Sequence, residues 1–349
     1  MTITIRDVAE KAGVAPSTVS RVIADSPSIS EKTKKKVRQV MQALHYIPNT
    51  SAQNLARSHS QTIGIVLPKD SDAFYQNPFF PTVLRGINDE AAKHDYSILL
   101  STGNTNEDRM QHVQQMVLGH QVEGLIFLYA LQEDPLIDFA LANHFPMIVI
   151  GSPDNIHVNS VDNYNEEIAR EATEHLINQG CQHLLWVGGD PTQRFIQLRE
   201  QGFREVLTKY QLEITEDQLI NDVEFLPYEG YQLAKRLTET NAPFDGIVVA
   251  DQLIARGIRE YFAYHPTLTA PKLITFKSYQ QERHGNPLRE SYINLKSQKL
   301  GSHSVSLLFD IMRLNQPDNE EERIIHDYIK SSLITEEETA SAETMNPDL

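Results

Sequence analysis

The sequence has 349 residues, of which 40% are hydrophobic and 22% charged, enough chain for two or three domains with large apolar cores. Its first residues, MTITIRD, lack the apolar run of a signal peptide, and the longest apolar run, about residues 124–131, is far too short to span a membrane. The single cysteine, Cys181, excludes an internal disulfide and suits a reducing compartment. We therefore expect a cytoplasmic protein with no membrane partner.

The net charge of −16 is divided unevenly along the chain. Residues 1–59 contain nine Lys/Arg and four Asp/Glu, a net charge of +5, and the remaining 290 residues carry −21. This asymmetry predicts a small polyanion-binding head on an acidic body that DNA would repel. The alternative is that the lysine-rich run 32–36 forms only a solvated helix face.

The first 48 residues are predicted to form a helix-turn-helix head. Thr4 and Asp7 have a spacing close to that of a capping box, and Gly13 suits the left-handed conformation that ends a helix. The predicted helices cover residues 5–12, a segment that begins at Pro16, and a segment from after Ser30 to about Leu44. Two short helices joined by a glycine turn and braced by a third form such a head, and an ordinary three-helix bundle is the alternative.

The second predicted helix has the pattern of a DNA-reading helix. If Val19, Val22 and Ile23 face the core, small side chains, hydroxyls and one cation remain outside or at the N-terminal end. Short hydroxyls let the backbone approach DNA, and Arg21 can reach a guanine edge or a phosphate. The residues predicted to meet DNA here are Pro16, Ser17, Thr18, Ser20 and Arg21.

The next segment, YIPNTSAQNLAR at residues 46–57, is predicted to contain a hinge helix. Pro48 ends the third helix, and Asn49 or Ser51 can cap a following helix of about seven residues. A helix this short would fold only on a partner, such as DNA together with the same segment of a second copy. Leu55 would then insert into a minor-groove base step. A disordered linker is the alternative.

From Thr62 onward, apolar segments alternate with amphipathic ones. Strands are predicted at about 63–67, 96–100, 124–128, 147–150, 183–188, 246–250, 273–276 and 292–295. Helices are predicted at about 80–93, 107–118, 134–143, 164–179, 195–210, 228–240, 252–263 and 298–313. This alternation indicates an α/β body with two doubly wound parallel sheets. Ligands of such folds bind outside the carboxyl ends of strands, here between two lobes.

Residues 3–58 resemble the DNA-binding head of the LacI/GalR repressor family. The resemblance is carried by IRDVAEKAGV at 5–14, STVSRV at 17–22, SEKT at 30–33, YIPN at 46–49 and AQNLA at 52–56. It implies that Pro16, Ser17 and Arg21 face bases. The side chains that it assigns mainly to the DNA backbone are those of Thr18, Thr33, Tyr46 and Asn49. The residues that it assigns to the minor groove are Ala52 and Leu55.

The body, about residues 60–335, also resembles this family, whose two lobes are similar to periplasmic sugar-binding proteins. Residues 77–87, 149–153 and 161–165 look most like its maltose-operon repressor branch. The resemblance implies three crossings between the lobes, near residues 161, 291 and 324. The implied domains are a head at 1–48, a hinge helix and linker at 49–60, an N-terminal lobe at 61–161 with 292–323, a C-terminal lobe at 162–291 with 324–338, and a disordered acidic tail at 339–349.

The candidate effector residues combine aromatic rings with planar hydrogen-bonding groups, which suits the apolar faces and hydroxyl rim of a sugar. The candidates are Phe79, Phe80, Asp162, Asn163, Arg199, Asp251 and Lys277. Arg199 matches the Arg-x-x-Gly-Phe motif of the family, which implies that it contacts the effector. The alternatives are that Phe79 belongs to the core and that Asp251 only caps a helix.

Three positions depart from the family pattern. Lys277 stands where the family often has an acid that holds a sugar hydroxyl. Gly151 stands where many relatives have Asp, and Ala250 where some have Asn. These departures imply an effector other than a simple galactoside, and they are compatible with maltose.

Patterns of catalysis and metal binding are missing from the sequence. The thirteen histidines are scattered, with no HExxH motif and no Cys/His cluster at metal-ligand spacing. We therefore expect neither an enzyme nor a cofactor. A sugar-processing enzyme with Asp162 and Asp251 as an acid/base pair is one rival hypothesis, and a sugar-binding transport receptor is another.

The sequence thus predicts a homodimeric repressor that binds a pseudo-palindromic operator in double-stranded DNA. A small effector between the lobes, maltose or another sugar, would control its DNA affinity. The alternatives are a catabolite-control-type regulator that uses a phosphoprotein corepressor and a sugar-binding protein without a role at DNA.

Ala15 precedes the second helix at a position where the family usually has Ser. Because a serine hydroxyl there would accept a hydrogen bond from the first turn, we expect Ala15→Ser to stabilise the isolated head by ~0.5–2 kcal/mol. Thermal unfolding of a fragment of residues 1–60 measures this change. An unchanged or lower melting temperature would contradict the predicted start of the helix.

Overall fold

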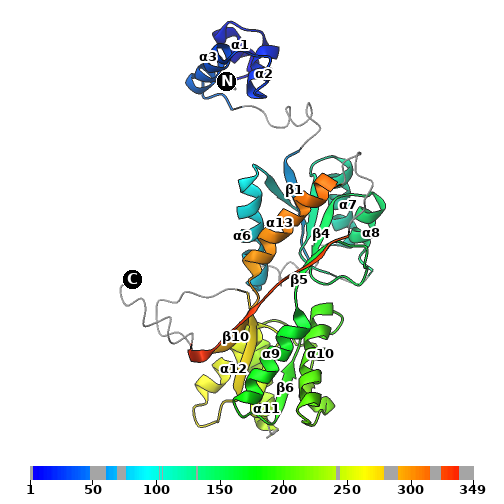
Figure 1. Ribbon diagram of the computed structural model, residues 1–349. Coiled ribbons are helices and arrows are strands. Elements are labelled where there is room, and N and C mark those ends of the chain that lie inside the picture. The colour runs from blue at the N-terminus through cyan, green and yellow to red at the C-terminus, as the bar shows by residue number, and fades with distance from the viewer. Residues whose placement is uncertain are drawn as a thin grey trace. The chain divides into compact units, whose positions relative to one another are not determined.

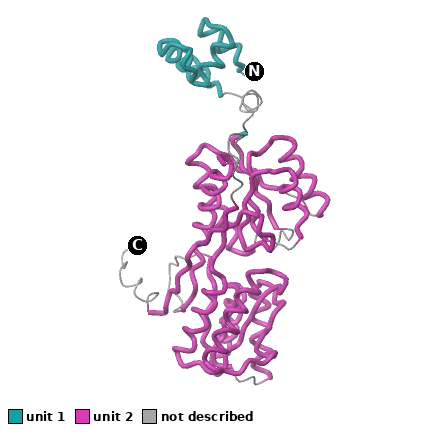
Figure 2. Tube along the Cα trace, turned by 45° about the vertical axis from the view of Figure 1, so that its right-hand side comes forward, with its two compact units in different colours: residues 1–60 teal, residues 61–349 magenta. Residues whose placement is uncertain are grey.

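The computed structural model describes residues 3–47, 60–68, 76–101, 103, 105–130, 133–240, 244–278, 290–314 and 324–337. The chain divides into two compact units, Met1–Ser60 and Gln61–Leu349, which Figure 2 shows in teal and magenta. The predicted hinge helix and the acidic tail at 339–349 lie outside the described residues. Within the described part of the chain, no helix combines the length and the apolar character that a membrane span requires.

The first unit is the predicted three-helix head. Its helices are α1 (Ile5–Ala12), α2 (Pro16–Ile23) and α3 (Glu31–Ala43). The backbone N–H and the hydroxyl of Thr4 donate to the Asp7 carboxylate at 2.7 and 2.8 Å, and Gly13 ends α1 with a φ of 63°. Ala15 is the N-cap of α2 and makes no side-chain capping bond. The buried core of the head consists of Val8, Ala9, Ala12, Val19, Val22 and Val37.

The N-terminal lobe of the second unit contains a parallel sheet with the strand order β11-β5-β4-β3-β1-β2. Its strands are β1 (Thr62–Val66), β2 (Ser97–Leu100), β3 (Gly124–Phe127), β4 (Met147–Ile150), β5 (Ser160–Asn163) and β11 (His326–Ile329). Its helices are α6 (Phe79–Lys93), α7 (Asn106–Leu118), α8 (Pro135–Ala142) and α13 (Ser297–Leu314). Successive residues of a strand point to opposite faces, so Ile126 packs in the core under α6 and α13, whereas Phe127 packs in the core under α7 and α8 (Figure 1).

The C-terminal lobe contains a second sheet, with the strand order β12-β10-β9-β8-β6-β7. Its strands are β6 (Leu184–Val187), β7 (Leu219–Ile220), β8 (Gly246–Val249), β9 (Lys272–Lys277), β10 (Ser291–Asn294) and β12 (Ser332–Ile334). Only β12 is antiparallel among these described strands. Its helices are α9 (Asn165–Asn178), α10 (Arg194–Lys209), α11 (Pro227–Glu239) and α12 (Gln252–Tyr264), and a short 3₁₀ helix, η1 (Glu216–Gln218), precedes β7. Helices α9 and α10 cover one face of the sheet, and α11 and α12 cover the other.

The predicted α/β fold with a helical head and two doubly wound lobes is confirmed, and so are the predicted strands and helices of the body. The sequence prediction missed β5, β7, β11 and β12. β5, β11 and β12 mix polar with apolar side chains, and β7 has only two residues, so none of them contains the longer apolar run that predicted the others.

The crossings between the lobes lie later in the chain than the sequence predicted. β5 belongs to the first sheet and α9 to the second lobe, so the first crossing is at residue 164. β10 belongs to the second sheet and α13 packs on the first, which places the second crossing at 295–296. β11 and β12 place the third at 330–331. The predicted limits at 161, 291 and 324 are therefore corrected, because each neighbouring short strand stays with its own sheet.

Helices α6 and α13, which lie side by side in Figure 1, approach closely at two glycines. A Cβ atom added to Gly86 would lie 1.9 Å from the carbonyl oxygen of Gln298, and one added to Gly301 would lie 2.1 Å from that of Val83. Both obstacles are backbone atoms of the opposite helix, which cannot rotate away. The N-terminal lobe therefore depends on the absence of side chains at this contact.

Gly301→Ala tests this contact. Alanine is the better helix former by about 1 kcal/mol, so the substitution would stabilise an isolated helix. In the packed pair the new methyl group forces the helices apart, and we expect a net loss of about 1–3 kcal/mol. Urea unfolding of the full chain measures the change, with Lys299→Ala on the exposed face of α13 as the control. Equal stability of Gly301→Ala and the wild type would contradict the close approach.

Candidate nucleic-acid interface and effector site

The outer side of α2 has the composition predicted for a DNA-reading surface. Pro16, Ser17, Ser20 and Arg21 are exposed and Thr18 is half-buried, whereas Val19 and Val22 are buried in the core of the head. Pro16 is the first residue of the helix, so the backbone N–H groups of its first turn point out beside the hydroxyls. The head thus presents one cation, three hydroxyls and a helix N-terminus on one short element.

The lysine-rich run of α3 is only partly exposed, because one of its lysines is buried and paired with carboxylates. Lys34 is only 6% exposed, and its ammonium lies 3.1 Å from the Asp25 carboxylate and 3.0 Å from that of Glu31. The guanidinium of Arg38 also contacts Asp25, at 2.6 Å. The free positive charge of the head is therefore smaller than the count of cations in its sequence suggests.

The remaining predicted DNA contacts fall into two groups. Thr33 is half-buried, and its hydroxyl lies 2.9 Å from that of the N-cap Ser30. Tyr46 packs against the core of the head and is also half-buried. Asn49, Ala52 and Leu55 lie outside the described residues.

The centre of the candidate effector site is the side chain of Arg199, on α10. Although it is charged, it is only 5% exposed. Its Nε donates to the Asn165 side-chain oxygen at 2.9 Å, and Nη1 donates to the carbonyl of Ala250 at 3.1 Å. Its guanidinium also lies 4.3 Å from the ring centre of Phe276 and 5.0 Å from that of Phe195. Burial lowers the pKa of Arg199 to about 10, against the opposing effect of Asp162 and Asp251, so it remains charged at neutral pH.

Asp162 provides one of these two carboxylates, from the end of β5. Burial raises its pKa, and three donors oppose the rise by favouring the charged form. These are the Ser152 hydroxyl at 2.7 Å, the backbone N–H of Asn163 at 2.7 Å and the Asn165 side-chain amide at 2.9 Å. The predicted site residues Asp162 and Arg199 are thus linked through Asn165, a residue that the sequence pattern did not single out.

Asp251 provides the other carboxylate and connects the two lobes. Its Oδ1 caps α12 by accepting from the Leu253 backbone N–H at 2.7 Å, so the predicted capping role is confirmed. Its Oδ2 accepts from the Asn77 side-chain amide of the N-terminal lobe at 3.1 Å. Burial raises the pKa of Asp251 to about 6, although both hydrogen bonds and Arg199 favour its charged form. Asp162, Asn165, Arg199, Asp251 and Asn77 together are called the effector cluster below.

The other predicted effector residues have different surroundings. Phe79 and Phe80 form an edge-to-face pair with ring centres 5.4 Å apart and pack against the core of the N-terminal lobe without being fully buried. Lys277 forms an ion pair with the buried Glu290, and its ammonium lies 4.5 Å from the ring centre of Tyr292. Glu290 also contacts Arg259 at 2.6 Å. The lysine at this departure from the family pattern is thus part of an ion-pair network.

The side chain of Asn163 binds the backbone of two other segments. Its side-chain amide donates to the carbonyl of Leu295 at 3.0 Å and to that of Ile329 at 2.9 Å, so both of its N–H groups are committed to the backbone. These two N–H groups are not available to a sugar hydroxyl, and contact between Asn163 and the effector stays a prediction.

The chemistry of the effector cluster is that of a polar ligand site. It offers a planar guanidinium, two carboxylates and two amides beside aromatic rings, the combination of groups that binds sugar hydroxyls. Among the described residues, no three His, Cys, Asp or Glu side chains are grouped in a way that could hold a metal ion.

Comparisons with known proteins agree with both parts of this architecture. The family model "Bacterial regulatory proteins, lacI family" matches residues 4–49, and "Periplasmic binding proteins and sugar binding domain of LacI family" matches residues 60–274. The chain is 39% identical over 316 residues to the HTH-type transcriptional regulator MalR of Streptococcus pneumoniae, covering 90% of this chain and 94% of that protein. The chain belongs to the LacI family.

Solved structures show the same fold for this LacI-family chain. The Lac repressor dimer bound to operator and the anti-inducer ONPF matches with a TM-score of 0.82 at 23% identity, over 96% of this chain and 98% of that one. A probable maltose operon transcriptional repressor, malR, from Staphylococcus aureus matches with a TM-score of 0.68 at 23% identity, over 79% and 96%. These structures show the shared fold, and the family models together with the similarity to MalR confirm the predicted membership of the family.

The charged members of the effector cluster were predicted from the sequence, but its two amide side chains, those of Asn77 and Asn165, were not. Asn77 directly precedes Pro78 and the start of α6, and its Oδ1 accepts from the Phe79 backbone N–H at 2.9 Å. Asn165 is the first residue of α9. Both positions look like local helix-start residues in the sequence, and only the tertiary structure brings them to Asp251 and Arg199.

Asp251 should make stability depend on pH. Its pKa is raised in the folded chain, so folding favours the neutral form of its carboxyl group. The resulting contribution to the free energy of unfolding is fully present below about pH 4 and is lost as the pH rises through about 6. Asp251→Asn keeps a capping oxygen but cannot titrate. We expect the stability of the wild type relative to this variant to fall by about 3 kcal/mol between pH 4 and pH 7, because a difference of one in pKa between the folded and unfolded chain corresponds to about 1.36 kcal/mol.

Urea unfolding of the full chain and of the variant across this range measures the difference. A stability difference that does not change with pH would contradict the raised pKa. An opposite slope, with the wild type gaining relative stability as pH rises, would show that the carboxylate is stabilised in its charged form.

Proposed function

We propose that this protein is a sugar-responsive repressor that binds operator DNA as a homodimer, with maltose or a short maltodextrin as its effector. The observation that carries the proposal is the contact between Asn77 and Asp251, which joins the two lobes beside a buried arginine. A ligand that enters this cluster must compete with or add to a contact between lobes, so its binding is coupled to how the lobes sit.

The DNA-binding part of the proposal is supported by α2 and by membership of the LacI family. In a helix-turn-helix unit, the N-terminal side chains of the second helix reach base edges in the major groove. Arg21 is exposed there, and neither Asp25 nor Glu31 holds it as they hold the cations of α3. One head offers a single short recognition helix, and a two-fold pair of heads doubles this surface, which favours a dimer on a palindromic site.

The choice of maltose is supported by similarity to MalR and by the chemistry of the effector cluster. A carboxylate, an amide and a guanidinium that converge beside Phe195 and Phe276 can accept from and donate to the hydroxyls of a glucose unit while a ring covers its apolar face. The effector would shift the population between a DNA-competent and a DNA-incompetent arrangement. A hundredfold change in operator affinity requires ~2.7 kcal/mol of coupling, at about 1.36 kcal/mol per factor of ten.

Operator binding tests the proposal. Duplexes selected from a random library by the purified chain provide an operator, and gel shifts with and without maltose and maltotriose give the response. We expect salt-sensitive binding whose affinity changes at least about tenfold with one of these sugars. Binding that ignores both sugars would overturn the effector assignment, and the absence of salt-sensitive binding to any duplex would overturn the role at DNA.

A pair of arginine variants isolates the reading surface. Arg21→Ala should lower affinity for the selected operator by about 1–3 kcal/mol while changing affinity for random duplexes much less. Arg38→Ala removes the same charge from a side chain held by Asp25 and serves as the control. Equal losses in the two variants would show that Arg21 adds only charge and reads no base.

A further inference from the structure

The side chain of Asn163 lies at the first crossing between the lobes and binds the backbone at the other two. Asn163 ends the strand before the first crossing, Leu295 lies in the second, and Ile329 ends the strand before the third. The Asn163 amide nitrogen is 3.0 Å from the Leu295 carbonyl oxygen and 2.9 Å from the Ile329 carbonyl oxygen, and the residue is 3% exposed. The first and third of these segments are also paired as strands β5 and β11, and the Asn163 nitrogen adds a direct bond from them to the second.

We propose that Asn163 is a positioning residue that joins the three crossings into one hinge and links that hinge to the effector cluster. The proposal deepens the proposed function, on which it rests, because it concerns how a ligand between the lobes changes the state of the whole body.

The chemistry of the position favours asparagine. A primary amide places two N–H groups on one nitrogen, so it can donate to two carbonyls at once, and the short side chain of asparagine fits between them. Aspartate has nearly the same shape but would present a carboxylate oxygen to each carbonyl. Two attractions would then become two repulsions in a buried place, where unsatisfied acceptors are costly.

A chain of hydrogen bonds leads from this hinge to Arg199. The backbone N–H of Asn163 donates to Asp162, the Asn165 amide donates to the same carboxylate, and the Asn165 oxygen accepts from Arg199. A ligand that moves the guanidinium therefore acts on the first crossing directly. It acts on the second and third crossings through the two bonds of the Asn163 amide.

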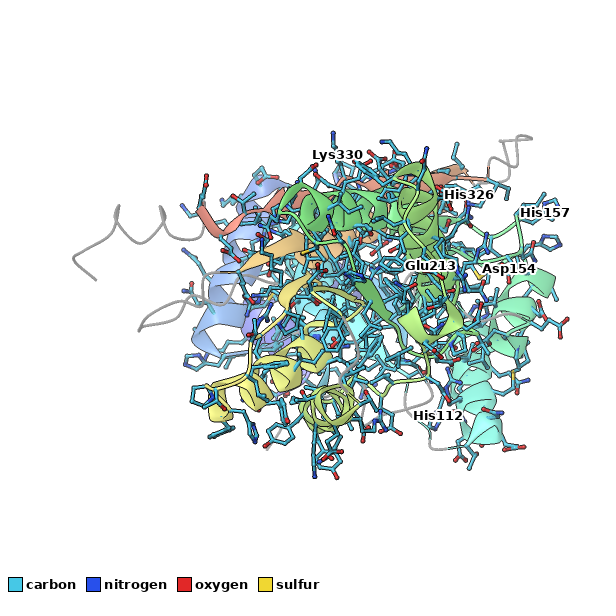
Figure 3. The ribbon with its side chains drawn as sticks, turned by 90° about the horizontal axis from the view of Figure 1, so that it is seen from below. His112, Asp154, His157, Glu213, His326 and Lys330 are labelled. Carbon is cyan, nitrogen blue, oxygen red and sulfur yellow. The ribbon has the colours of Figure 1, made fainter. Side chains whose placement is uncertain are left out.

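Tyr164, the residue after Asn163, links two of the crossings in a different way. The ring of Tyr164 stacks on that of Tyr328 with centres 4.7 Å apart, and both rings are exposed. This stack joins the first and third crossings on the outside, near Lys330, which Figure 3 labels. The stack does not include the second crossing, so a hinge that moves as one body needs the buried amide as well.

The proposal is tested with Asn163→Asp in the full chain, with Asn106→Asp as the control. Asn106 is an exposed asparagine at the start of α7, so its replacement introduces the same charge and shape change away from the hinge. Hydrogen–deuterium exchange is measured on the backbone amides around residues 161–166, 293–297 and 328–333. We expect exchange in all three stretches to be about tenfold faster in Asn163→Asp and unchanged in Asn106→Asp.

A second readout separates positioning from simple support of the fold. The ratio of operator affinities with and without maltose should fall by about tenfold in Asn163→Asp, while operator affinity without maltose stays close to that of the wild type. Asn163→Ser, which is neutral and keeps at most one of the two bonds, should lie between the wild type and Asn163→Asp. If Asn163→Asp does not fold, the exchange rates and the maltose response of Asn163→Ser test the proposal in its place.

Unchanged exchange at the second and third crossings in the folded variants would overturn the proposal, and so would an unchanged maltose response together with faster exchange. If the wild type itself does not respond to maltose, the proposed effector is wrong, and the exchange experiment alone then decides whether Asn163 joins the crossings.

Discussion

The burial of one guanidinium in a polar cluster that includes two carboxylates is the interaction on which the arrangement of this body depends. Arg199 remains charged although almost no solvent reaches it, so its surroundings must supply the hydrogen bonds and the opposite charge that water would supply. Asp162 comes from the first sheet and Asp251 from the second lobe. Replacing Arg199 by a neutral residue would leave both carboxylates buried without a cation, a change that typically costs several kcal/mol.

This dependence explains why the polar groups around Arg199 are both numerous and specific. Each carboxylate is raised in pKa by burial, and each is held by donors that favour its charged form. The cluster is therefore balanced between desolvation and hydrogen bonding. A ligand with several hydroxyls can replace some of these contacts without leaving a buried group unsatisfied, which is the property that a sugar sensor needs.

Electrostatics also divides the protein into two parts with different partners. The head has a net positive charge and the body a strongly negative one, so attraction to a polyanion is confined to the first residues. Within the head, Lys34 and Arg38 are bound by Asp25, which narrows the exposed cationic surface. Under the proposed function, DNA affinity depends on these few exposed side chains and on how the heads of a dimer are held.

Local chemistry made much of the fold predictable from the sequence. Thr4 with Asp7, Gly13 and Pro16 act on backbone groups a few residues away, so the limits of α1 and the start of α2 followed from the sequence. The long apolar strands likewise required burial on both faces of a sheet. The charged candidates Asp162, Arg199 and Asp251 were recognisable because carboxylates at strand ends and a motif arginine are visible without coordinates.

Contacts between distant segments were decided only by the tertiary structure. Nothing in the local sequence of Asn163 distinguishes an amide that binds a ligand from one that binds the carbonyls of Leu295 and Ile329. The same holds for Asn77 and Asn165, and for the short strands β5 and β11, whose pairing depends on a neighbour more than a hundred residues away. The sequence by itself determined the elements and the types of charge, because these follow from interactions between near neighbours. The packing of the sheets decided which buried donors bind which acceptors. Hydrogen bonds act only over about 3 Å, so the chain must fold before distant partners come within reach of each other.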